Sequence, residues 1–338
     1  MNLTDKKYSQ YSLTKEMLET VEVMRNFDVN IGKKYSADIK AKKGIFYTGE
    51  GSSRLFPGKR AIYETMKDSG HKPSATDGAT QALEYDLSDY AVIGLSNSGK
   101  TKELVRLYHK LTKDNHNAFF GITAFDNTPV ADLPKQSTVL SCGPEMAVAA
   151  TKSVIEQALV VDSIVHAVND KEMPSLEVAA NAVETVLTQE IDPELINKIA
   201  NAGTIYFAGR NNGVAEELTL KTNEITRKKS DYLEGTYAAH GIEEVQNKED
   251  VIIVIDPFEA EEEKFKECLV DGVGLTIIAI STRDTIFPTI KIPKVDHYQN
   301  YVELAAGWNL LVDTGIKLGI EIDKPVRARK VGNEFIPE

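Results

Sequence analysis

The sequence predicts an α/β protein built from two parallel sheets, each covered by helices on both faces. Three observations support this prediction. Short apolar runs with little alternation recur along the chain, as is typical of strands that are buried on both faces. These runs alternate with helical patterns, which favours parallel connections between strands. The order of apolar strand, glycine-containing turn and helix also begins twice, near Gly44 and near Thr204, which indicates an internal duplication.

The first half is expected to open with a helix at residues 12–27. Its residues Leu18, Val21 and Met24 fall near one face, and Ser12 is the expected N-cap. The chain then alternates between predicted strands at 43–50, 90–96, 118–125 and 137–142 and predicted helices at 54–70 and 102–114. Residues 150–200 have an almost wholly helical pattern.

The second half repeats the alternation. We predict strands at 204–209, 250–257, 275–281 and 289–293, and helices at 213–227, 260–272 and 301–319. The expected organisation is a helical segment at 1–43, a first domain at 44–195, a second domain at 196–320 and a C-terminal tail at 321–338 that covers the active site.

Composition excludes several classes of protein. The 338 residues are 42% hydrophobic and 27% charged, which is typical of a soluble globular protein. A formal net charge of -12 argues against a nucleic-acid partner, which would need a clustered basic face. No apolar run is long enough to span a membrane, and the N-terminus lacks the apolar core of a signal peptide. Two distant cysteines, Cys142 and Cys268, form neither a disulfide framework nor a zinc cluster, so we expect a cytoplasmic protein.

The stretch "AVIGLSNSGKT", which ends at Thr101, points to phosphate. Residues 94–101 fit G-x-x-x-x-G-K-[ST], the phosphate loop of nucleotide hydrolases, and "VIIVID" could supply a later acidic partner at Asp256. The turn also carries three hydroxyls, at Ser96, Ser98 and Thr101. Hydroxyls and free N–H groups at a helix start can enclose a phosphate monoester without a metal. This stretch alone leaves three interpretations open: a nucleotide site, a monoester site and a capped helix start with no ligand.

A second turn favours the monoester. "GEGSSR" (49–54) places Ser52 and Ser53 at another junction of strand and helix. A single Gly-Ser turn is common in loops, but two serine-rich turns after successive strands are a more specific signal.

This pair of turns resembles the two sugar-phosphate motifs of sugar isomerase (SIS) domains, and most closely those in the isomerase half of glucosamine-6-phosphate synthases. Residues 143–159 ("GPEMAVAATKSVIEQAL") are similar to the family's "G-E-GVASTKAFT-QL", and 207–210 and 216–226 match its "LGRG" and "LEGALKLKEIS". The resemblance covers nearly the whole chain. It implies two flavodoxin-like SIS domains, with no cofactor and no metal. It also implies phosphate contacts from Ser53, Ser96, Ser98 and Thr101, and substrate contacts from Gly51, Ser52, Asn97, Gly99, Ala149 and Lys221.

The same resemblance supplies acid–base groups. Glu224 lies in "LKTNEIT" and matches the family glutamate that moves a proton between C1 and C2, although a helix glutamate taken alone usually faces solvent. His240 follows sixteen positions later, at the offset of the family's ring-opening histidine. Lys330 falls five residues after Pro325, like the family lysine that forms an imine with the ketose. The motifs differ from the family at Ala150, at Ile242 and in "GRN", and these differences bear on which sugar is bound.

The implied activity is a C1–C2 isomerisation of a hexose or aminohexose 6-phosphate, either aldose–ketose or deaminating. A fructosamine-6-phosphate deglycase is the nearest alternative enzyme, and a non-catalytic sugar-phosphate sensor is the alternative from another class. The segment before residue 44 is too short for the synthase's glutaminase domain, so we expect no glutaminase activity. The resemblance further implies a homodimer with composite active sites, in which His240 of one chain joins Glu224 of the other.

Overall fold

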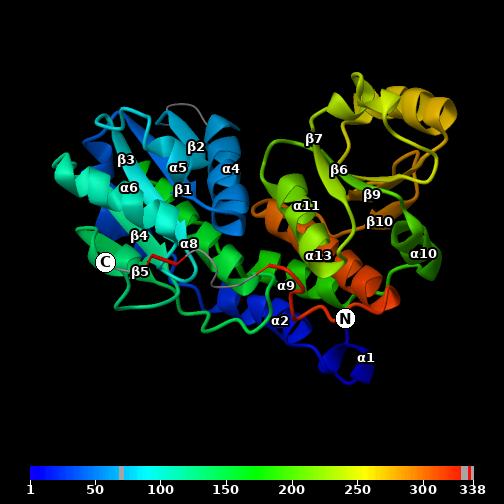
Figure 1. Ribbon diagram of the computed structural model, residues 1–338, viewed down its shortest axis with the longest axis horizontal. Coiled ribbons are helices and arrows are strands. Elements are labelled where there is room, and N and C mark those ends of the chain that lie inside the picture. Colours follow the sequence, from blue (N-terminus) through cyan, green and yellow to red (C-terminus); the bar gives the residue numbers. More distant parts are fainter. Residues whose placement is uncertain (68–71, 329–333, 336–338) are drawn as a thin grey trace. The chain divides into compact units, whose positions relative to one another are not determined.

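The computed structural model describes residues 1–67, 72–328 and 334–335 (Figure 1). The chain divides into two compact units, each built on one sheet. The first-sheet unit comprises Val23–Glu145, Ala150–Ser175 and Arg327–Glu338. The second-sheet unit comprises Met1–Glu22, Met146–Ala149 and Leu176–Val326.

The first sheet has five parallel strands in the order β2-β1-β3-β4-β5. They are β1 (Gly44–Gly49), β2 (Ser74–Gly78), β3 (Tyr90–Ser96), β4 (Phe119–Thr123) and β5 (Gln136–Val139). Its helices are α3 (Ser36–Lys40), α4 (Ser52–Lys67), α5 (Ala79–Ala82), α6 (Lys102–Lys113), α7 (Pro129–Asp132) and α8 (Lys152–Val168). All six residues of β1 are buried, which explains its unbroken apolar run.

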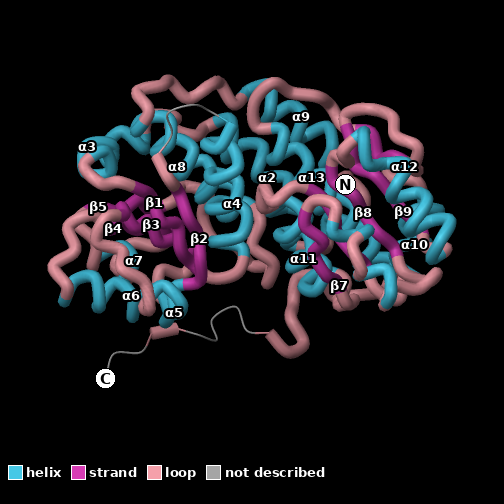
Figure 2. Tube along the Cα trace, turned by 90° about the horizontal axis from the view of Figure 1, so that it is seen from above, coloured by secondary structure: helices cyan, strands magenta, loops and turns pink. Residues whose placement is uncertain are grey.

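Alternate residues of β1 point to two separate cores. Ile45 and Tyr47 pack with residues of α3, α4 and α8. Phe46 packs on the other face, with residues of α5, α6 and α7. Figure 2 shows these helices on opposite sides of the strands. The first sheet is therefore the middle layer of a three-layer unit, as predicted.

The second sheet is also parallel throughout, in the order β10-β9-β8-β6-β7. Its strands are β6 (Ile205–Gly209), β7 (Ser230–Glu234), β8 (Val251–Ile255), β9 (Thr276–Ser281) and β10 (Thr289–Lys291). Helices of this unit include α1 (Lys6–Ser9), α9 (Glu177–Thr188), α10 (Pro193–Asn201), α11 (Val214–Ile225), α12 (Glu262–Phe265) and α13 (Gln299–Lys317), and α2 (Ser12–Arg25) begins in it. Counted along the chain, both sheets have the order 2-1-3-4-5, so the halves repeat one topology.

Several details differ from the sequence prediction. The edge strands β2 and β7 were not predicted, because their sequences "SATDG" and "SDYLE" are polar and partly exposed. The predicted helix at 260–272 is α12 followed by a π-helix over Lys266–Val273. Ser12 does not cap α2 but is its first residue, and the Asp323 carboxylate accepts from the N–H groups of Ser12 and Leu13 at 2.8 Å each. No described helix is long and apolar enough to cross a membrane.

A buried ion pair joins α4 to α8. The Arg60 guanidinium donates to the Asp162 carboxylate, and the two side chains are only 6% and 5% exposed. Removing one partner of such a pair leaves a charge in a poorly solvated place, which costs more than the pair contributes when intact. Because Ser52 and Ser53 begin α4, the pair also fixes the helix that carries the first serine turn.

We expect Asp162→Asn to lower the free energy of unfolding by about 3–5 kcal/mol, because the Arg60 charge loses its buried counter-ion. Urea denaturation measures the loss. The control is Asp114→Asn, which breaks the exposed Lys110–Asp114 pair and should cost less than about 1 kcal/mol. The double variant Arg60→Met with Asp162→Leu should recover most of the loss. Equal costs for Asp162→Asn and Asp114→Asn would contradict this account.

Candidate functional site

The two predicted serine turns lie at the carboxyl ends of strands in the first sheet. The winding of the sheet reverses at β1, because β2 lies on one side of this strand while β3, β4 and β5 follow on the other. In open parallel sheets, ligands bind outside the carboxyl ends of the strands at such a reversal. Gly49 at the end of β1 pairs with Leu95 near the end of β3, so both turns start at the reversal point. The structure therefore brings Ser52, Ser53 and the turn 96–101 to the same place.

The turn after β3 is closed by its own hydroxyls. Ser96 is buried, and its Oγ lies 2.7 Å from Thr101 Oγ1 and accepts from the Gly99 N–H at 3.1 Å. Ser98 Oγ accepts from the Lys100 N–H at 3.2 Å. Thr101 is the N-cap residue of α6, but its hydroxyl does not bond to the helix N–H groups. The start of α6 is the positive end of its helix dipole, which attracts anions.

Gly99 is required in this turn. Its φ is +67°, a left-handed conformation that side chains rarely adopt. A Cβ here would lie 2.2 Å from Thr128 Oγ1 and 2.7 Å from Thr123 Oγ1. The glycine of the motif therefore serves the close packing of this turn, whether or not a nucleotide binds.

The turn after β1 also has a left-handed glycine, Gly51, with φ +54°. Ser52 is largely buried at the start of α4, and Ser53 is half-buried beside it. Glu50, which was not among the predicted site residues, accepts from the Ala79 N–H at 3.0 Å. Burial raises the pKa of Glu50, and the bond from Ala79 works in the opposite direction. A carboxylate thus borders the serine turn and contacts the start of α5.

In the second-sheet unit, α11 carries the predicted proton-transfer group in an ion-pair cluster. Lys221 is fully buried, and its Nζ lies 2.6 Å from the Glu224 carboxylate and 3.2 Å from that of Glu217. Burial acts to lower the pKa of Lys221, but the charges of Glu224 and Glu217 outweigh it and the net shift is upward. Glu224 is 24% exposed, so its carboxylate remains reachable from solvent. The structure therefore brings Lys221 and Glu224 together on α11.

The other predicted residues lie elsewhere. His240 is exposed in the loop after β7, where its Nε2 lies 3.3 Å from Lys264 Nζ. Among the described residues, no hydrogen bond or ion pair joins His240 to Glu224. Ala149 is buried in the second-sheet unit. Lys330 lies outside the described residues.

The reversal point of the second sheet is lined differently. Arg210 follows β6 and pairs with Asp256 after β8 at 2.7 Å, and its guanidinium lies 4.3 Å from the ring centre of Phe258. The first half places hydroxyls at this position, whereas the second half places an ion pair. Asp256 was the acidic partner required by the nucleotide interpretation. It ends a strand of the other sheet and its carboxylate is held by arginine.

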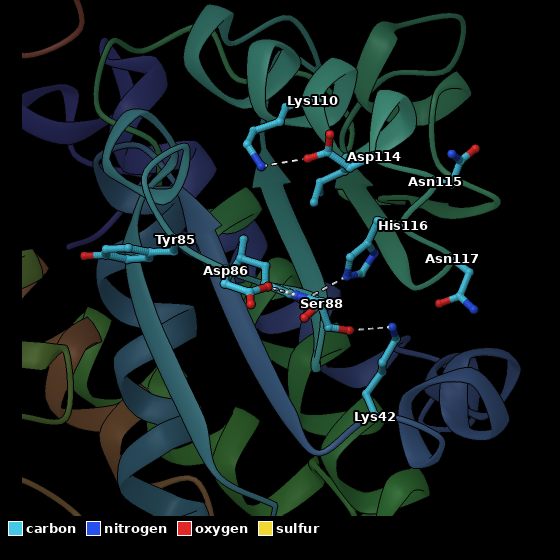
Figure 3. Close-up of a pocket in the computed structure, with 11 residues that line it drawn as sticks. Lys42, Tyr85, Asp86, Ser88, Lys110, Asp114, Asn115, His116 and Asn117 are labelled. Carbon is cyan, nitrogen blue, oxygen red and sulfur yellow. Dashed lines mark hydrogen bonds and ion pairs between the residues drawn. The ribbon is translucent and has the colours of Figure 1, made fainter.

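One pocket of the first-sheet unit lies at the amino ends of its strands, before β1, β3 and β4 (Figure 3). Together with its neighbour it forms a shallow region, and each holds about 320–330 Å³. Its charged groups satisfy one another: Lys110 pairs with Asp114 at 2.7 Å, and Lys42 donates to the Ser88 carbonyl at 2.8 Å. This pocket lies at the opposite ends of the strands from the serine turns.

Residues 39–167 match the model of the SIS domain. A comparison with curated proteins finds no match to the chain. Among solved structures, a tagatose-6-phosphate ketose/aldose isomerase from Escherichia coli is similar with a TM-score of 0.78 and 17% identity, over 95% of this chain and 98% of that one.

Two further solved structures have the same fold. The C-terminal domain of glucosamine-fructose-6-phosphate aminotransferase from Francisella tularensis gives a TM-score of 0.76 at 18% identity, over 95% of this chain and 100% of that one. A glucosamine-6-phosphate deaminase from Thermotoga maritima gives 0.69 at 18% identity, over 96% and 99%.

The chain is thus an α/β protein with two flavodoxin-like halves of one topology. Its residues 39–167, which contain the first sheet and its serine turns, match the SIS domain model, and the fold agrees with that of the three solved structures over nearly the whole length. The predicted resemblance and fold class are confirmed.

His116, which lines the pocket in Figure 3, yields a prediction about pH. Its Nε2 lies 3.0 Å from the Leu87 carbonyl and its Nδ1 accepts from the Ala118 N–H at 3.2 Å, so the folded protein holds a neutral ring. Burial lowers the pKa of His116, partly offset by the bond to Leu87. The unfolded chain then binds more protons as the pH falls below about 6.5, and the free energy of unfolding must decrease.

Urea denaturation between about pH 8 and about pH 5 tests this expectation. The wild type should lose more stability on acidification than His116→Gln, which cannot take up the proton. A variant with the same pH dependence as the wild type would show that His116 does not contribute.

Proposed function

We propose that this protein is a sugar-phosphate isomerase that acts on a hexose or aminohexose 6-phosphate. The observation that supports this proposal most strongly is the meeting of two serine-rich turns at the reversal point of the first sheet. Dianionic phosphate is suited to a site made of hydroxyls, backbone N–H groups and the start of a helix. Two proteins of similar fold, a tagatose-6-phosphate ketose/aldose isomerase and a glucosamine-6-phosphate deaminase, act on this class of ligand.

In this proposal the turns hold the phosphate and the acid–base groups act at the other end of the sugar. Ser53, Ser96, Ser98 and Thr101 provide the phosphate contacts. Gly51, Ser52, Asn97, Gly99 and Ala149 line the substrate.

Glu224 is the proposed base that moves a proton between C1 and C2. Its 2.6 Å ion pair with Lys221 fixes the carboxylate in one position, which favours a defined direction of proton abstraction. His240 opens the sugar ring, and Lys330 reaches the open-chain carbonyl. We further propose a homodimer in which His240 completes the site of the neighbouring chain, and no cofactor takes part.

Removing a hydroxyl from the turn should weaken phosphate binding. Ser98→Ala and Thr101→Ala each delete a hydrogen bond to a charged oxygen, and such bonds contribute about 1.5–3 kcal/mol. Isothermal titration calorimetry with fructose 6-phosphate measures the change, and Ser88→Ala at the opposite edge of the sheet is the matched control. Magnesium-dependent hydrolysis of ATP that disappears in Lys100→Ala would support the nucleotide interpretation and contradict the proposed sugar-phosphate site.

The catalytic assignment is tested by proton exchange. Glu224→Gln keeps the shape of the side chain and removes the proton acceptor, so turnover should fall about 100-fold or more while binding is largely retained. Deuterium incorporation at C1 or C2 of a panel of hexose 6-phosphates in heavy water, followed by NMR, reports the step directly. Glu194→Gln, an exposed glutamate on α10, is the control. Wild-type exchange rates in Glu224→Gln would exclude Glu224 as the base. Binding without exchange in the wild type would indicate a sensor.

A further inference from the structure

Glu145 is a buried carboxylate that the predicted chemistry does not use. It lies in the loop between β5 and α8 and is 7% exposed. Its Oε1 accepts from the Thr151 N–H at 2.7 Å and from the Thr151 hydroxyl at 3.2 Å, and its Oε2 accepts from the Ser153 hydroxyl at 2.5 Å. Thr151 is the N-cap residue of α8, so the carboxylate sits at the positive end of this helix. The helix start therefore fixes Glu145 in one orientation.

The same carboxylate reaches the phosphate turn. Asn97 Nδ2 lies 3.5 Å from Glu145 Oε2. The backbone of Asn97 is fixed as well, because its carbonyl accepts from the Ala124 N–H at 3.1 Å and from the Thr123 hydroxyl at 3.3 Å. Glu145 thus connects the cap of α8 to the centre of the turn between Ser96 and Ser98.

This contact decides which end of the Asn97 amide faces Glu145. An ionised carboxylate only accepts hydrogen bonds, so the NH₂ group of Asn97 must point toward it. The Oδ1 atom is then directed away from Glu145. An amide oxygen cannot donate to a phosphate oxygen, but it can accept from a hydroxyl or an ammonium group.

We propose that Glu145 is a positioning residue that orients Asn97, so that Asn97 Oδ1 accepts a hydrogen bond from a hydroxyl group of the sugar. The inference rests on the proposed function, since it takes the turn to be the phosphate site. Asn97 then allows the site to bind sugar phosphates more tightly than inorganic phosphate. The serine and threonine hydroxyls bind the phosphate group common to both ligands, whereas Asn97 binds only the ligand that carries a sugar.

The test compares two ligands, fructose 6-phosphate and inorganic phosphate, by calorimetry. Asn97→Ala should weaken binding of fructose 6-phosphate about five- to tenfold, the usual effect of one hydrogen bond, and leave binding of inorganic phosphate unchanged. Glu145→Gln should reduce the ratio of the affinity for fructose 6-phosphate to the affinity for inorganic phosphate. The reason is that a glutamine can donate a hydrogen bond and no longer fixes the amide of Asn97. Asn117→Ala, at the opposite edge of the sheet, is the control and should not change the ratio.

A double variant separates positioning from a purely structural role. Asn97→Asp alone places two carboxylates side by side and should reduce the ratio. Adding Glu145→Gln provides a donor for Asp at position 97, so the double variant should recover the ratio. Thermal unfolding confirms that each variant is folded. Equal weakening of both ligands by Asn97→Ala, or no recovery in the double variant, would overturn the proposal. Inorganic phosphate binding that does not respond to Ser98→Ala would instead refute the proposed phosphate site.

Discussion

The parallel pairing of β1 with β3 is the constraint on which the candidate site depends. Because β2 lies on the outer side of β1, the connections after β1 and β3 leave the sheet in opposite directions. The turns that begin there contain left-handed glycines at 51 and 99. The helices α4 and α6 start from these turns, so the same pairing that builds the sheet aims two helix N-termini at one point.

The second half keeps this geometry and changes its chemistry. At the corresponding reversal point the ion pair of Arg210 and Asp256 stands where the first half has hydroxyls. A second group of charged side chains lies on α11, where Lys221 is buried between two carboxylates. Repetition of a topology therefore leaves the side chains at each reversal point free to differ, since the sheet requires only that the strands be buried and the turns be short.

Much of this could be predicted from the sequence, because the signals are local. Central strands such as β8, "VIIVI", are buried on both faces and must be apolar, and α6 follows a turn with recognisable hydroxyls. The edge strands β2 and β7 escaped prediction because one side of an edge strand has no neighbour, so polar residues are tolerated there. The capping residue of α2 was not predicted for another reason: Asp323 lies 311 positions from Ser12, and no local sequence pattern links the two residues.

By itself, the sequence determined the fold class, the repeated alternation of strands and helices and the two serine turns, since burial and turn chemistry act over a few neighbouring residues. The tertiary structure alone decided that both turns meet at one reversal point and that Glu145 reaches Asn97. These relations depend on which strand lies beside which and how each helix packs. The physical reason is that they join residues from different elements, whose distance in space is set by the pairing of strands and not by separation along the chain.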